Sequence, residues 1–60
     1  MTQYVIVDIN HVGRANWRAY IPLLDDFVDA TSEDRVRYEA YRQIEEALGL
    51  KSFVITWREV

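Results

Sequence analysis

The sequence contains no cysteine and only one histidine, His11. Without cysteine the chain can form neither disulfide bonds nor thiolate metal sites, and one imidazole is too few for a multi-histidine zinc site. An activated nucleophile would need His11 together with a serine or threonine, but Thr31 and Ser32 are better explained as helix caps. We therefore predict that the chain is not an enzyme and that it uses no cofactor.

Glycine and proline are also scarce, with two glycines and one proline in the chain. Two isolated glycines do not make a glycine-rich phosphate-binding loop. Acidic residues are more numerous, and Asp8, Asp25, Asp26 and Asp29 carry the oxygen ligands that hard cations prefer. Their spacing is not that of a calcium-binding loop, so we interpret them as a solvated acidic surface and predict no metal site.

Long apolar runs are missing too. The run from Tyr4 to Val7 ends at Asp8, which is far short of a signal peptide or of the roughly 18 apolar residues of a membrane span. We expect a cytoplasmic protein that does not enter a membrane. The net charge of −3 disfavours non-specific nucleic-acid binding, which usually rests on a basic face.

The residues that are abundant are apolar, at 50% of the 60 residues, which predicts a single compact domain over residues 1–60. Residues 3–9 are rich in β-branched and aromatic types and predict a strand. Residues 51–59 predict a second strand, in which Phe53, Ile55 and Trp57 alternate with more polar positions.

The clearest predicted helix covers residues 33–48. Thr31 or Ser32 supplies an N-cap, and Gly49 supplies a C-terminal stop. Glu33 and Arg37 stand four residues apart, in the orientation that favours an ion pair. The predicted buried stripe consists of Val36, Ala40, Ile44, Ala47 and Leu48.

Residues 16–30 have two interpretations. Apolar residues recur at helical spacing from Trp17 to Val28, so we favour a helix, but Pro22 would disrupt its second turn. The predicted fold is a small two-layer α+β domain with the order strand-helix-helix-strand; the alternative is strand-strand-helix-strand with residues 16–21 as a second strand. Two strands make a poor sheet, which favours a homodimer paired through a sheet edge.

One local pattern resembles a nuclease family. Residues 5–12, Val-Ile-Val-Asp-Ile-Asn-His-Val, followed by Trp-Arg-Ala-Tyr at 17–20, resemble the opening strand and helix of 5′-nucleases of the flap-endonuclease type. The resemblance covers about the first 20 residues and implies that Asp8 takes the place of a metal-binding aspartate. The chain departs from the family at Ile9, where the family has glycine, and in having no aspartate at the end of its last predicted strand. The prediction that the chain is not an enzyme therefore stands.

The function predicted from these residues is protein binding. Exposed tyrosine beside arginine is the composition of interface hot spots. The predicted partner-binding residues are Tyr38, Tyr41, Arg37, Arg42, Asp25, Asp26 and Asp29. Size and acidity favour an inhibitor or adaptor of the phage or mobile-element type that binds a host protein. The alternative is a single-stranded nucleic-acid-binding protein that uses His11, Arg14 and Arg18 with an exposed aromatic residue.

Overall fold

The structure, a computed structural model, describes residues 2–49 and 52–60. Its elements, in chain order, are β1 (Gln3–His11), β2 (Trp17–Ile21), β3 (Asp26–Ala30), α1 (Glu33–Leu48) and β4 (Phe53–Glu59). The four strands form one mixed sheet in the order β3-β2-β1-β4. β1 is antiparallel to β2 and parallel to β4, which the chain reaches through α1. The protein is therefore a small α+β domain.

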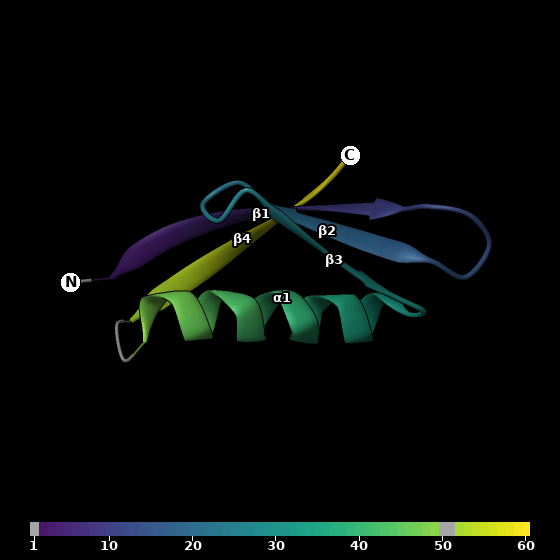
Figure 1. The fold of residues 1–60 in the computed structure, drawn as a ribbon. Coiled ribbons are helices and arrows are strands. Elements are labelled where there is room, and N and C mark those ends of the chain that lie inside the picture. The colour runs from purple at the N-terminus through teal and green to yellow at the C-terminus, as the bar shows by residue number, and fades with distance from the viewer. Residues whose placement is uncertain (1, 50–51) are drawn as a thin grey trace.

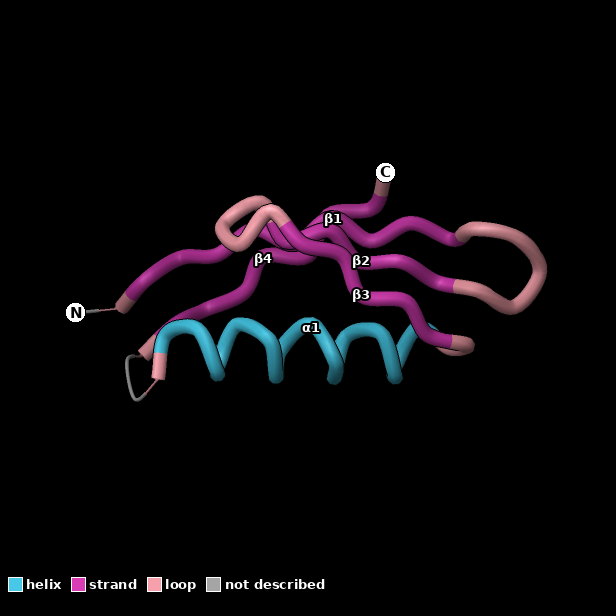
Figure 2. Tube along the Cα trace, viewed as in Figure 1, coloured by secondary structure: helices cyan, strands magenta, loops and turns pink. Residues whose placement is uncertain are grey.

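The two layers of the domain are the sheet and α1 (Figure 1). α1 runs beneath one face of the sheet, and no described element covers the opposite face (Figure 2). Within residues 2–49 and 52–60, no helix has the length and apolar character needed to cross a membrane.

The favoured helix over residues 17–30 is wrong, and the alternative second strand is confirmed as β2. Pro22 begins a turn after β2, and the chain returns antiparallel as β3, an additional strand. Two backbone hydrogen bonds close this turn, from Leu24 N–H to the Ile21 carbonyl (3.1 Å) and from Asp25 N–H to the Pro22 carbonyl (3.2 Å). Asp25 adopts a φ of 51°, a conformation that aspartate tolerates better than most residues.

The apolar residues that suggested a helix are divided between the two faces of the β2–β3 hairpin. Ala19 pairs with Val28 on the face toward the helix, whereas Tyr20 pairs with Phe27 on the opposite face. Both strands therefore have apolar residues at successive positions. This run of apolar positions happens to match a helical period, which is why the spacing misled the prediction.

The hydrophobic core lies between the sheet and α1. Its members are at most 2% exposed and come from β1, β2 and the helix: Val5, Val7, Ile9, Ala19, Ile21, Val36, Ala40 and Ile44. The predicted helical stripe is thus confirmed at its first three positions, while Leu48 is half-buried and Ala47 is exposed. Alternation within β1 sends Val5, Val7 and Ile9 into this core.

The predicted helix over residues 33–48 is confirmed with both of its ends. The Ser32 hydroxyl accepts a hydrogen bond from the Arg35 N–H (3.2 Å), which caps the first turn. Gly49 has a φ of 68°, which glycine adopts without a steric penalty, and its N–H donates to the Glu45 carbonyl. The last predicted strand is confirmed from residue 53 to residue 59; residue 51 lies outside the described residues.

Candidate functional site: the open face of the sheet

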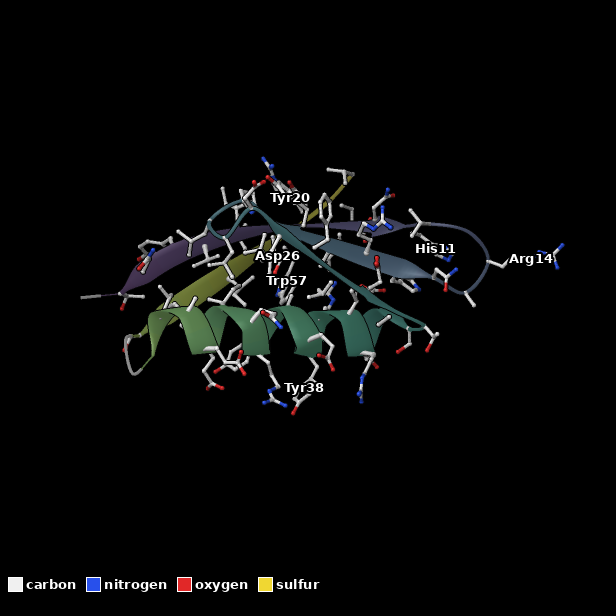
Figure 3. All side chains as sticks on the ribbon, in the orientation of Figure 1. His11, Arg14, Tyr20, Asp26, Tyr38 and Trp57 are labelled. Carbon is white, nitrogen blue, oxygen red and sulfur yellow. The ribbon has the colours of Figure 1, made fainter. Side chains whose placement is uncertain are left out.

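The face of the sheet that points away from α1 is called here the open face. Side chains alternate along each strand, so the register fixes which residues project from it. They are Tyr4, Ile6, Asp8 and Asn10 of β1, Arg18 and Tyr20 of β2, Phe27 and Asp29 of β3, and Val54, Thr56 and Arg58 of β4. Figure 3 shows Tyr20 on this side of the sheet, opposite the helix.

Large apolar side chains are exposed on the open face. Phe27 is 56% exposed, and its ring centroid lies 4.8 Å from that of Tyr20, its cross-strand partner. Near the start of β1, Tyr4 is 77% exposed and pairs in register with Val54, with Ile6 as the next residue on that face. Water therefore contacts apolar groups at both ends of this face, an arrangement that typically marks a binding surface.

Two ion pairs join neighbouring strands on the open face, beside these apolar groups. Arg58 Nε is 2.7 Å from Asp8 Oδ1, and Arg18 Nε is 2.8 Å from Asp29 Oδ1. Asp8 accepts a hydrogen bond from Arg58, which raises the pKa of that guanidinium. Each arginine of the open face therefore already has a carboxylate partner within the same protein.

The Tyr20 hydroxyl joins the open face to the β2–β3 turn. It donates a hydrogen bond of 2.8 Å to Asp25 Oδ1. This bond to a carboxylate, helped by desolvation and by the negative charge of Asp25, raises the pKa of Tyr20 above its ordinary value. The bond holds the phenol ring across the sheet beside Phe27.

A shallow hollow of about 300 Å³ lies in the open face. It is lined by Asp8, Asn10, Arg18, Tyr20, Phe27 and Val60. Small-molecule sites usually enclose most of the ligand, and this hollow is broadly open to solvent. Its polar and aromatic lining is better suited to side chains projecting from another macromolecule.

The helix residues predicted to bind a partner separate into two groups. Tyr38 and Arg42 are exposed, and Tyr38 points away from the sheet (Figure 3). Arg37 instead approaches β4, with its guanidinium 5.1 Å from the centroid of the Trp57 ring, and Tyr41 approaches Phe53. The structure therefore does not bring the four helix residues into one patch.

The predicted acidic residues lie on the sheet and its turn, because the helix predicted for that segment does not form. Asp29 projects from the open face of β3, and Asp25 reaches the same face through Tyr20. The Asp26 carboxylate accepts a hydrogen bond of 2.8 Å from the Phe27 N–H at the start of β3. Asp25 and Asp29 thus border the open face at its β3 side, whereas Asp26 pairs in register with the core residue Ile21 and belongs to the helix side of β3.

The residues of the nucleic-acid alternative are also separated. His11 stacks on Trp17, with ring centroids 4.4 Å apart and planes at 11°, and its Nε2 lies 3.3 Å from the Arg14 carbonyl oxygen. His11 and Arg14 lie at the far end of the β1–β2 hairpin (Figure 3). Arg18 projects from the open face, beside Asp29.

Metal coordination finds no support in the described part of the chain. Within residues 2–49 and 52–60, no three histidine, cysteine or acidic side chains are grouped so that they could hold a metal ion. Asp8 is the residue that the nuclease resemblance identified as a metal ligand. Its carboxylate is paired with the Arg58 guanidinium, at a position where metal binding would require another oxygen ligand.

No protein-family model matches this chain, and no curated protein or solved structure is significantly similar to it. The candidate site is therefore defined by geometry. Sequence reasoning missed its central residues, Tyr4, Ile6, Tyr20 and Phe27. The available signal was the two-sided apolar pattern of residues 4–9, which indicates a strand with apolar groups on both faces.

Proposed function

We propose that this chain is a protein-interaction module that binds a partner protein through the open face of its sheet. The observation that carries the proposal is the exposed ring of Phe27 beside the half-buried ring of Tyr20, with Arg18 5.5 Å from the centroid of the Phe27 ring. Aromatic residues and arginine supply most of the binding energy in protein interfaces, where a partner excludes water from them.

Charge indicates the chemistry of the partner. Asp25 lies beside the aromatic pair and accepts a hydrogen bond from Tyr20, whereas Arg18 and Arg58 are neutralised by Asp29 and Asp8. A complementary partner therefore carries an apolar patch that is bordered by lysine or arginine. The same distribution disfavours phosphate groups, because a phosphate would have to displace a carboxylate from either arginine.

We propose that such a module acts by binding to a surface of its partner protein, as an inhibitor or an adaptor does. The exposed ring of Phe27 and the guanidinium of Arg18 beside it suit binding of this kind. Action on a host protein, in the manner of small phage and mobile-element proteins, and a cytoplasmic location both remain predictions from size and composition.

The test compares two aromatic substitutions of similar exposure on opposite sides of the molecule. Phe27→Ser alters the open face, and Tyr38→Ser alters the outer surface of α1; these residues are 56% and 52% exposed. Both variants are first checked for folding by circular dichroism. A photo-cross-linking amino acid is then placed at position 27 or 38 of otherwise wild-type protein, and its adducts in extracts of the source cells are identified by mass spectrometry.

The proposal predicts a protein adduct from position 27, whose yield falls at high salt and whose linked peptide carries apolar and basic residues. Binding of that protein, once purified, is lost with Phe27→Ser and retained with Tyr38→Ser. Adducts from position 38 only, with binding lost in Tyr38→Ser, would place the interface on the helix and overturn the proposal.

A nucleic-acid function has one observation in its favour. Phe27 lies beside Arg18 on an exposed sheet face, and single-stranded nucleic acids bind such faces by stacking bases on aromatic rings. A gel-shift assay at low salt with single-stranded DNA and RNA tests this alternative. A retarded band that Phe27→Ser abolishes would support it in place of protein binding.

A further inference from the structure

The outer edge of β4 offers unpaired backbone groups. Gln3 N–H donates to the Ser52 carbonyl (3.0 Å), and Val60 N–H donates to the Ile9 carbonyl (3.1 Å). The even-numbered residues of the β4 segment therefore direct their backbone N–H and carbonyl groups toward β1. Successive residues of a strand direct these groups to opposite sides. The N–H and carbonyl groups of residues 53, 55 and 57 therefore point outward, where no strand of residues 2–49 and 52–60 pairs with them.

The two edges of the sheet differ in how well they are protected against pairing. The opposite edge is β3, a strand of five residues that carries Asp26 and Asp29. Short length and charge are the usual protections of an edge strand. β4 has seven residues, and its stretch from Phe53 to Trp57 carries no charge and no proline. Of the two edges, β4 is the one suited to pairing.

The face of β4 toward the helix is also incompletely covered. Phe53, Ile55 and Trp57 point to that side and are only partly buried, although Val5 and Val7 on the neighbouring strand are at most 2% exposed. The backbone of α1 lies close to β2 and β3, and long helix side chains reach toward β4, where the Tyr41 ring centroid is 5.2 Å from that of Phe53. One strand thus has both an unpaired edge and a half-covered apolar face.

We propose that two copies of this chain pair through β4, antiparallel about a two-fold axis at Ile55, to form one continuous sheet. The residue types of the segment Phe53–Trp57 are symmetric about Ile55. A β-branched residue stands on each side of Ile55 (Val54 and Thr56), followed by an aromatic residue (Phe53 and Trp57). The two-fold axis places Ile55 opposite itself, Val54 opposite the partner's Thr56, and Phe53 opposite the partner's Trp57. Each outward-pointing residue then exchanges backbone hydrogen bonds with its opposite.

This register also completes the half-covered face. Aromatic cross-strand pairs flank the two Ile55 side chains on the helix side of the seam, an arrangement that stabilises antiparallel sheets. The two helices lie on that same face, one on each side of the seam, because α1 lies beneath β2 and β3. Moving the axis by one residue, to Thr56, would place Phe53 opposite the partner's Glu59. The Ile55 axis is therefore the favoured one.

A disulfide experiment tests the register. The chain has no cysteine, so introduced thiols have no native competitor. The single variants Val54→Cys and Thr56→Cys are mixed in equal amounts, oxidised gently and analysed by intact mass. The Ile55 axis predicts that the mixed disulfide between the two variants dominates, with little linkage in either variant alone. Self-linkage of Thr56→Cys as the main product would place the axis at Thr56 and overturn the proposed register.

A charge experiment tests dimerisation without cross-linking. Val54 and Thr56 project from the open face and are exposed, so both accept charged residues without loss of core packing. In the proposed register V54E/T56E sets like charges opposite each other, and V54E/T56K sets opposite charges there. We expect the dimer dissociation constant of V54E/T56E, measured by sedimentation equilibrium, to be roughly tenfold higher than that of V54E/T56K.

Equal dissociation constants for two folded variants would overturn the register, and a wild-type protein that stays monomeric up to millimolar concentration would overturn the dimer. This proposal does not rest on the function proposed for the open face. Phe27 lies on β3, at the other side of the sheet, so Phe27→Ser should leave dimerisation unchanged while it abolishes partner binding.

Discussion

Two adjacent residues of β1 give a sharp test of the two-sided sheet. Val7 is fully buried, whereas Ile6 on the open face is 44% exposed. Val7→Ala removes two carbons from the core at about 0.8 kcal/mol each and leaves a cavity, for a cost of about 2–3 kcal/mol. Ile6→Ala removes three carbons but leaves no enclosed cavity, so we expect a cost of roughly 1 kcal/mol. The smaller truncation is therefore predicted to be the more damaging.

The assay for this pair is urea denaturation at one protein concentration, followed by the fluorescence of Trp17 and Trp57. A domain of this size has a free energy of unfolding of roughly 3–9 kcal/mol, so Val7→Ala removes a large part of it. With a slope of about 1 kcal/mol per molar urea, the midpoint falls by about 2 M or more for Val7→Ala and by about 1 M for Ile6→Ala. Equal midpoints, or a lower midpoint for Ile6→Ala, would refute the assignment of the open face.

Three further predictions concern local interactions. Ser32→Ala should lower the free energy of unfolding by about 1 kcal/mol in the same assay because the helix loses its N-cap, and Ser32→Asp should largely restore it. Asp8→Asn should lower the free energy of unfolding by less than about 1 kcal/mol, because the Arg58 side chain is half-exposed. The difference in the free energy of unfolding between this variant and wild type should shrink at high salt. Folding raises the pKa of Tyr20 above the ordinary 10.0, so its hydrogen bond to Asp25 stabilises the fold below about pH 10, and this stabilisation is lost as the pH rises through the folded pKa. Asp25→Asn should therefore move the titration of Tyr20, followed by the absorbance of tyrosinate, back toward its ordinary range.

The elements predicted correctly are those whose periodicity extends over many residues or is supported by caps. Residues 33–48 combine a helical stripe with Ser32 and Gly49 at the two ends, so propensity, pattern and capping agree. The first strand is likewise marked by a β-branched run, although the structure extends it to His11. In both cases the local signals match the contacts that the fold later makes.

The segment from residue 17 to residue 30 shows where local signals are insufficient. Its apolar residues fit a helical stripe, but they equally fit two strands that place apolar groups on both faces, and only the sheet decides between these. Pro22 was the informative residue, because proline interrupts a helix and fits a turn well. The strand that follows was missed because Asp25 and Asp26 suggested a solvated helix face, whereas they lie at a turn and at the start of a strand.

The candidate site was harder to predict than the fold, because it depends on which face the helix covers. Tyr4 and Ile6 lie on one side of β1, and Val5 and Val7 lie on the other, so both sides are apolar in sequence. A chain with two predicted helices could have covered both sides. Once residues 17–30 form strands, one helix remains among the described residues, and the side of the sheet that lacks it becomes the exposed surface.

The same geometry explains why exposed apolar surface is concentrated at the open face and at β4. Four strands spaced about 4.8 Å apart make a sheet roughly 19 Å wide, whereas a helix with its side chains is about 10 Å across. A single helix therefore covers about half of one face, and α1 is placed beneath β2 and β3. The helix side of β4 is therefore only half-covered, and no described element covers the opposite face of the sheet. Because residues 2–49 and 52–60 include one helix, the proposed second copy at β4 and the proposed partner on the open face would cover two separate exposed regions of the same sheet.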